Sequence, residues 1–141
     1  MSQENVEIAR RSCDSFNRWA AAPDAEPPAN LAVEMLLHPD VEFHTYPDSP
    51  EAGVYRGVDE FIRYNQRLFA QFESVRIELD EVLPAGDKAA VISRQHAVPK
   101  GGQAAIVVQV VEVWKIRDGL LAERRTFATR RDALKAVGLE E

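Results

Sequence analysis

The amino-acid sequence predicts an α+β domain in which helices pack on one face of an antiparallel sheet. Two observations support this class. In residues 4–72, most apolar side chains recur at spacings of three and four, as on one face of a helix. From residue 74 onward the apolar period changes to two, which is typical of strands that bury one face. The length of 141 residues fits one domain, 1–141.

The first half begins with an amphipathic helix over residues 4–22. Its apolar stripe is Val6, Ala9, Cys13, Phe16 and Ala20. Proline-rich residues 21–28 end this helix, and a shorter helix follows through Leu31, Met35 and Leu36, stopping before Pro39. Residues 41–46 are predicted as a strand, 46–57 as a loop rich in proline and glycine, and 58–72 as a third helix.

The second half is predicted as four antiparallel strands joined by short turns. Residues 74–83 alternate, with Val75, Ile77, Leu79 and Leu83 on one side. The other strands are 88–98, 104–116 and 120–128, with turns at 84–87, 99–103 and 117–119; Thr129 is the predicted cap of a closing helix that ends at Gly138.

Charge and composition exclude several classes of partner. The formal net charge is −6, whereas nucleic acids and anionic membranes need a basic surface, so neither is expected. The most apolar window, 104–114, is interrupted by Gln109 and Glu112 and is too short to cross a bilayer. The N-terminus has no signal-peptide pattern, and the single cysteine, Cys13, suits a reducing cytoplasm. We therefore expect a cytoplasmic protein.

Both faces of strand 104–116 are largely apolar. Val108, Val110 and Trp114 lie on one side, and Val107, Val111 and Val113 lie on the other. One face should meet the helices, and the other needs a second cover. The sequence therefore predicts a homodimer through the outer face of the sheet.

Three segments carry a resemblance to a known family: HPDVEFHTYPDSPEAGVYRGVDEF (38–61), VVQVVEVWKIRDG (107–119) and RRDALKAVGLEE (130–141). Together with the order of elements, they resemble the SnoaL-like branch of the nuclear transport factor 2 (NTF2-like) superfamily. The resemblance implies a cone-like curved antiparallel sheet wrapped by N-terminal helices around an apolar cavity, in a protein that is often dimeric. The fold hosts unrelated activities, so it does not by itself imply a reaction.

Two enzymes of this superfamily imply pocket positions. The functional positions of ketosteroid isomerase look like Ser12, Thr45 and Glu112, of which Glu112 keeps the chemistry. Those of limonene epoxide hydrolase look like Arg94 and His96, then Thr126, then Phe43 and Thr45; only the arginine is kept. The polyketide cyclases are similar in fold. These alignments imply that even-numbered residues of the last three strands face the cavity.

The resulting hypothesis places a polar cluster at the end of an apolar pocket. His96 or Glu112 would move a proton, and Arg94 would hold an anionic or carbonyl oxygen. The alternative is a structural polar network, since ion pairs inside a protein also need partners. The expected substrate-binding residues are Phe43, Thr45, Trp114, Arg124, Thr126, Phe16 and Trp19.

No metal and no cofactor are predicted. The three histidines and Cys13 lack the spacing of metal ligands, and there is no glycine-rich phosphate loop. His38 is expected at a helix C-terminus, and His44 on the side of its strand opposite Phe43 and Thr45.

Three functions remain open from the sequence. The first is a cofactor-independent acid–base enzyme, an isomerase, cyclase or hydratase, acting on an apolar, oxygen-bearing metabolite. The second is a non-catalytic domain that binds a small hydrophobic molecule in the same cavity. The third is a dimerisation or interaction module whose cavity is filled by side chains.

Overall fold

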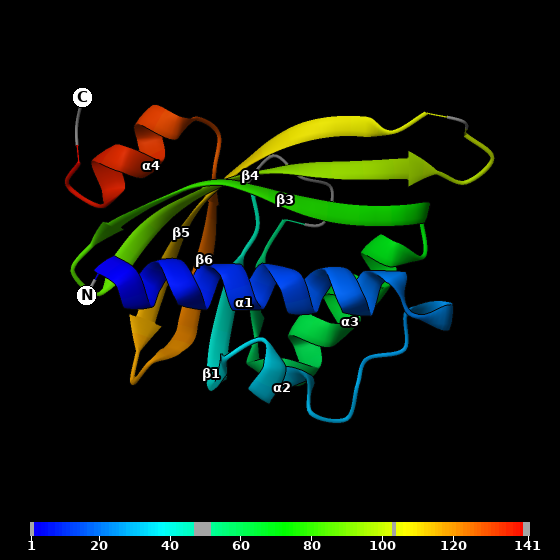
Figure 1. The fold of residues 1–141 in the computed structure, drawn as a ribbon, viewed down its shortest axis with the longest axis horizontal. Helices are drawn as coiled ribbons and strands as arrows, with labels where there is room; N and C mark the ends of the chain where they lie inside the picture. The colour runs from blue at the N-terminus through cyan, green and yellow to red at the C-terminus, as the bar shows by residue number, and fades with distance from the viewer. Residues whose placement is uncertain (1, 47–51, 103, 140–141) are drawn as a thin grey trace.

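The computed structural model describes residues 2–46, 52–102 and 104–139 (Figure 1). The helices are α1 (Ser2–Ala21), α2 (Leu31–Glu34), α3 (Gly57–Phe69) and α4 (Arg130–Ala136), with a 3-10 turn, η1 (Pro23–Ala25). The strands are β1 (Leu37–His44), β2 (Val54–Arg56), β3 (Phe72–Ala85), β4 (Lys88–Pro99), β5 (Ile106–Arg117) and β6 (Leu120–Phe127). None of the helices within the described residues is long and apolar enough to cross a membrane.

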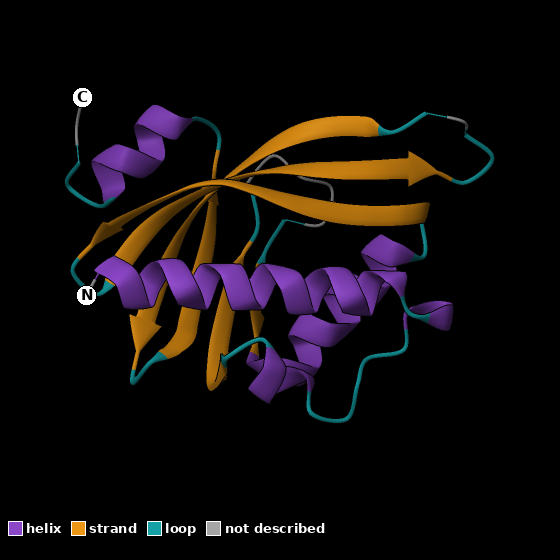
Figure 2. Cartoon of the chain, in the orientation of Figure 1, coloured by secondary structure: helices purple, strands orange, loops and turns teal. Residues whose placement is uncertain are grey.

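The six strands form one curved, unclosed sheet in the order β2-β1-β6-β5-β4-β3 (Figure 2). All neighbouring pairs are antiparallel except β1 and β6, which run parallel. The predicted α+β class with N-terminal helices against a mostly antiparallel sheet is therefore confirmed.

Helices cover the sheet from both sides. α1 crosses the sheet on one side, and α4 packs against β4, β5 and β6 on the other (Figure 1). The main core between α1, α3 and the sheet contains interlocking aromatic rings. Trp19 and Phe69 meet edge to face with centroids 5.0 Å apart, and Phe61 has no exposed surface. Such ring pairs stabilise the fold beyond the contribution of the apolar area that they bury.

The closing helix follows the prediction, and it has a structural role that the sequence did not reveal. The Thr129 side chain accepts a hydrogen bond from the Asp132 backbone N–H at 3.1 Å, as a capping residue does. Ala133 and Leu134 of α4 pack on Ala90 and Ile92 of β4 in a second apolar cluster. Part of the outer sheet face is thus covered by the chain itself, so a partner is not needed there.

The segment around Pro39 differs from the prediction. α2 ends at Glu34, Leu36 takes a left-handed conformation (φ 58°), and β1 already begins at Leu37. His38 therefore lies in a strand, 3.4 Å from the Arg117 guanidinium, and not at a helix C-terminus. Pro39 is tolerated because the pairing of β1 with β6 is irregular between Leu37 and Glu42.

Two further differences are local. The predicted loop 46–57 contains β2, which pairs with β1 through Tyr55 opposite Phe43; residues 47–51 of that loop, like residue 103 of the turn 99–103, lie outside the described residues. A three-residue strand is too short to show alternation. In β3 the register shifts between Leu79 and Glu81, so Leu83 packs with Ala90 under α4 and not with Ile77.

Candidate functional site

A pocket of about 190 Å³ lies between the sheet and helices α1 and α3. An apolar cavity of about 150 Å³ can hold a benzene-sized molecule, so the pocket has room for one substituted ring. Its walls are mostly apolar, with aromatic side chains from helix and strand. The lining residues are Ser12, Cys13, Phe16, Met35, Phe43, Thr45, Tyr46, Tyr64, Asn65, Leu68, Ile77, Val91, Ser93, Gln95, Val110, Glu112, Trp114, Arg124 and Thr126.

Glu112 lies on the pocket wall, on the face of β5 that its even number predicts. Its side chain is 4% exposed. Oε1 accepts a hydrogen bond from Trp114 Nε1 at 2.9 Å, and Oε2 accepts one from Arg124 Nη2 at 2.7 Å. A carboxylate so far from water needs such donors, because unpaired burial of a charge is costly.

Arg124 lies beside Glu112 because β5 and β6 are neighbours, with Trp114 opposite Arg124 and Glu112 opposite Thr126. Its guanidinium carbon lies 5.0 Å from the centroid of the Phe43 ring and 5.4 Å from that of Trp114. These ring faces attract the cation, and they fix its orientation together with Glu112. The expected neighbourhood of Glu112, Arg124 and Trp114 is present.

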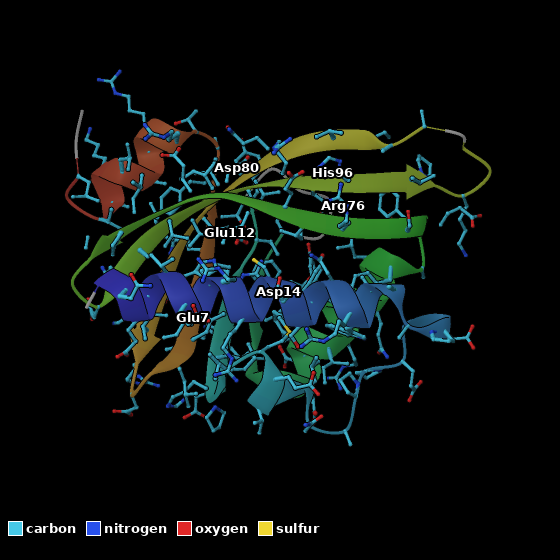
Figure 3. All side chains as sticks on the ribbon, viewed as in Figure 1. Glu7, Asp14, Arg76, Asp80, His96 and Glu112 are labelled. Atoms are coloured by element: carbon cyan, nitrogen blue, oxygen red, sulfur yellow. The ribbon has the colours of Figure 1, made fainter. Side chains whose placement is uncertain are left out.

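Arg94 and His96 do not face the pocket, so this part of the predicted site is wrong. The Arg94 guanidinium donates to both carboxylate oxygens of Asp80, at 2.9 Å from Nε and 2.8 Å from Nη2. His96 Nε2 lies 3.0 Å from Glu78 Oε1. In Figure 3, Glu112 lies between the strands and α1, whereas Asp80 and His96 lie beyond the strands. We call this outer group, Glu78, Asp80, Arg94 and His96, the outer charge cluster.

The error has a simple geometric cause. Each even-numbered residue of β4 lies opposite an odd-numbered residue of β5: Arg94 opposite Gln109, and His96 opposite Val107. Opposed residues share a face, so the even side of β5 is continuous with the odd side of β4. A shift of one residue in the connecting turn exchanges the two faces of a strand.

Ser93 and Gln95 occupy the pocket positions that were assigned to Arg94 and His96. The sequence analysis missed them for the same reason. It also missed Asn65 of α3, which is 4% exposed and donates to the Phe61 carbonyl at 2.9 Å. A polar residue inside the otherwise apolar stripe of that helix was the available signal.

The other expected contact residues divide into two groups. Phe16, Phe43, Thr45, Trp114 and Thr126 line the pocket, and their contact with a ligand stays a prediction. Trp19 does not line it. Trp19 is 1% exposed, and its Nε1 donates to the Ala25 carbonyl at 2.9 Å, because it faces the turn after α1.

Thr45 and Ser12 stand where the resemblance implies a base and a tyrosine. The Thr45 hydroxyl accepts from the Gly53 backbone N–H at 2.9 Å, which ties β1 to the segment before β2. Ser12 lines the pocket from α1 and is 1% exposed. Neither side chain is a general base at neutral pH.

Cys13 lines the same pocket, and burial raises the pKa of its thiol to about 11; the Glu112 charge adds to this, while Arg124 opposes it. The thiol is therefore neutral at pH 7 and a weak nucleophile.

This shift has a consequence for stability at high pH. The folded pKa lies above the unfolded value, so the neutral thiol stabilises the fold fully below about pH 8.5. That contribution should disappear as the pH rises toward 11. We expect wild type to lose on the order of 2 kcal/mol more than Cys13→Ala between pH 8 and 11, measured by urea unfolding. Parallel pH profiles for the two proteins would contradict the expectation.

A second group of polar side chains lies outside the pocket. Ligand atoms of Glu42, His44 and Glu123 lie within 4.8 Å of one another, a grouping that could hold a metal ion and that sequence spacing did not suggest. His44 Nε2 lies 2.9 Å from Glu42, and this hydrogen bond holds the pKa of Glu42 below its usual value. Arg56 and Arg125 lie 3.6 and 3.5 Å from the two carboxylates and balance their charge.

Comparison with known proteins agrees with this fold. One similar solved structure is Bal32a from a soil-derived mobile gene cassette, with a TM-score of 0.73 and 20% identity over 96% of this chain and 97% of that one. A second is an NTF2-like protein of unknown function from Burkholderia pseudomallei, with a TM-score of 0.71 and 18% identity over 95% of this chain and 97% of that one. A third is a protein from Jannaschia sp. CCS1 put forward as a SnoaL-like polyketide cyclase, with a TM-score of 0.68 and 21% identity over 99% of this chain and 94% of that one.

A search among curated proteins finds no match. The family description "SnoaL-like domain" matches residues 16–124, which include the end of α1, all of α3 and strands β1 to β5. This match covers most of the chain and agrees with the NTF2-like architecture of the solved structures. The chain therefore belongs to the SnoaL-like domain family.

Proposed function

We propose that this protein binds a small, largely apolar, oxygen-bearing molecule in the pocket between the sheet, α1 and α3. The observation that carries the proposal is an apolar pocket with one buried ion pair, Glu112–Arg124, on its wall. Ligand sites in proteins combine apolar walls with a few placed polar groups in this way. Open space among these side chains weighs against a cavity that is filled and vestigial.

The first form of this function is a cofactor-independent acid–base enzyme, an isomerase, cyclase or hydratase, with Glu112 as the proton acceptor. A carboxylate has about four lone-pair sites, and Trp114 and Arg124 occupy two of those of Glu112. Acceptor capacity thus remains for a ligand. The relative put forward as a polyketide cyclase supports an enzyme of this fold.

The second form is a binding domain without catalysis. A specific observation favours it: Arg94 and His96 belong to the outer charge cluster, so no histidine or second carboxylate is among the described lining residues. Acid–base enzymes commonly divide proton donation and acceptance between two groups. Glu112 would then serve recognition alone.

Mass spectrometry of the purified protein tests binding. We expect a small molecule to co-purify with wild type and with Arg94→Phe, whose new ring lies on the outer face. Ser93→Phe places the same ring in the pocket from the neighbouring position and should abolish co-purification. Equal recovery from both variants would show that the molecule binds elsewhere. Incubating the recovered compound with wild type and Glu112→Gln then separates turnover from simple binding.

We propose further that two copies pair through the part of the outer face that α4 leaves uncovered. Val107 is opposite His96 on that face and is 51% exposed. An exposed valine at the end of a long hairpin is a common sign of an interface. A cytoplasmic location is supported by the single cysteine, and the net charge of −6 argues against a nucleic-acid partner.

Sedimentation at micromolar concentration checks the dimer. Wild type should sediment at twice the chain mass of 15.8 kDa, and Val107→Lys at the chain mass itself. Val33→Lys is the matched control, because Val33 is 69% exposed on α2, away from the sheet face. Wild type at 15.8 kDa would exclude the dimer.

A further inference from the structure

Arg124 has more hydrogen-bond donors than the described structure uses. A guanidinium carries five N–H groups. Among the described residues, the side chain donates one hydrogen bond, from Nη2 to Glu112. Its Nε is buried and has no partner there. The side chain lines the pocket and is 16% exposed, so its remaining terminal N–H groups can donate to an acceptor that enters the pocket.

The guanidinium is held in place before any ligand arrives. Glu112 accepts from Arg124 with one oxygen and from Trp114 with the other, so the carboxylate itself is fixed from two sides. The rings of Phe43, Phe61 and Trp114 lie with centroids 5.0, 5.8 and 5.4 Å from the guanidinium carbon. A donor fixed in this way loses little freedom when it binds an oxygen, which favours recognition.

The charge of the pocket selects among oxygen-bearing ligands. Of the described residues that line it, Glu112 and Arg124 are the two with formal charges, and they cancel. An anionic ligand would leave one uncompensated negative charge beside Glu112 in a mostly apolar space, which is costly. A neutral carbonyl oxygen accepts from the guanidinium without this cost.

We propose that Arg124 is the residue that recognises the ligand, by donating to a neutral carbonyl oxygen on a ring-sized molecule, and that Glu112 is a positioning residue that orients Arg124. The assignment rests on the proposed binding function and names its ligand class. It transfers to Arg124, on β6, the oxygen-holding role that sequence analysis gave to Arg94. It also predicts that the pocket prefers neutral carbonyl compounds to carboxylates of the same size.

Three probes of similar size separate the possibilities: acetophenone (neutral carbonyl), ethylbenzene (no acceptor) and benzoate (anion). Binding is followed by NMR titration of the tryptophan indole N–H signals, which include Trp114 on the pocket wall. We expect acetophenone to bind wild type about tenfold more tightly than ethylbenzene, as one hydrogen bond from a charged donor allows. Benzoate should bind no more tightly than ethylbenzene.

Variants assign the effect to Arg124. Arg124→Met alone leaves Glu112 unpaired and can unfold the protein, so Glu112→Gln/Arg124→Met, which keeps the pocket neutral, is made beside it. In the double variant, the affinity for acetophenone should fall to the affinity for ethylbenzene. Arg94→Met removes a guanidinium from the outer face and should change neither affinity.

The outcomes distinguish this inference from the function on which it rests. If none of the three probes binds wild type, the proposed pocket function fails, and the inference fails with it. If acetophenone and ethylbenzene bind equally, the pocket stands but the role of Arg124 is overturned. Tightest binding by benzoate would overturn the preference for neutral ligands, and an unchanged acetophenone preference in the double variant would overturn the assignment to Arg124.

Discussion

Replacing Glu112 by alanine is expected to lower the free energy of unfolding by about 3 kcal/mol, because it leaves the Arg124 guanidinium partly buried without its counter-ion. The Trp114 indole N–H would lose its acceptor as well. Urea unfolding followed by circular dichroism measures the change. Sequence analysis left open whether Glu112 moves a proton or belongs to a structural polar network.

A double-substitution cycle makes this expectation specific to the pair. Glu112→Leu/Arg124→Met removes both charges and should recover most of the stability, since apolar side chains of similar volume often replace a buried ion pair at little cost. The Glu112→Gln variant keeps an acceptor for Trp114, so its free energy of unfolding should lie between those of Glu112→Ala and the double variant. If the double variant is as unstable as the sum of the two single ones, the residues are not coupled and the ion pair is not what stabilises this wall.

Replacing Trp19 by alanine is expected to lower the free energy of unfolding by about 3–5 kcal/mol, as for other large buried aromatic residues. Trp19 is 1% exposed and lies against Phe16, Phe61 and Phe69, so the change leaves a cavity that the helices cannot close. The melting temperature should fall by about 10 °C or more. Trp19→Phe keeps the ring packing but loses the hydrogen bond to the Ala25 carbonyl, and should cost less.

This substitution also tests the corrected position of Trp19. Because Trp19 is outside the lining of the pocket, Trp19→Phe should bind the pocket probes as wild type does. Phe16→Leu, one turn earlier on α1 and in the lining, should change their affinity. A loss of binding in Trp19→Phe with an unchanged fold would restore Trp19 to the pocket wall.

Much of the fold could be predicted because its signals are local. The helical spacing of apolar residues predicted α1 and α3, alternation predicted β3, apolar runs bounded by short turns predicted β4 to β6, and the Thr129–Asp132 cap predicted α4. These patterns depend on residues only a few positions apart, where geometry is nearly fixed by the type of secondary structure. Elements without such a pattern, the three-residue β2 and the start of β1 before Pro39, were missed.

Prediction of the candidate site depended on the register between paired strands, and the sequence reveals that register only in part. Glu112, Trp114, Thr126 and Phe43 were placed correctly on the pocket side of their strands. Arg94 and His96 were not, because the face of β4 depends on which residue of β5 lies opposite it. A strand in which both sides carry apolar residues gives no second signal to fix that register.

The sequence by itself determined the α+β framework and the net negative charge, because each follows from residue type and local period, while its resemblance to the SnoaL-like family implied that Glu112 faces the pocket. Only the tertiary structure decided that Arg124, and not Arg94, is the cation beside that carboxylate. The physical reason is that side chains alternate strictly along a strand, so a single residue of register separates a pocket wall from an outer surface.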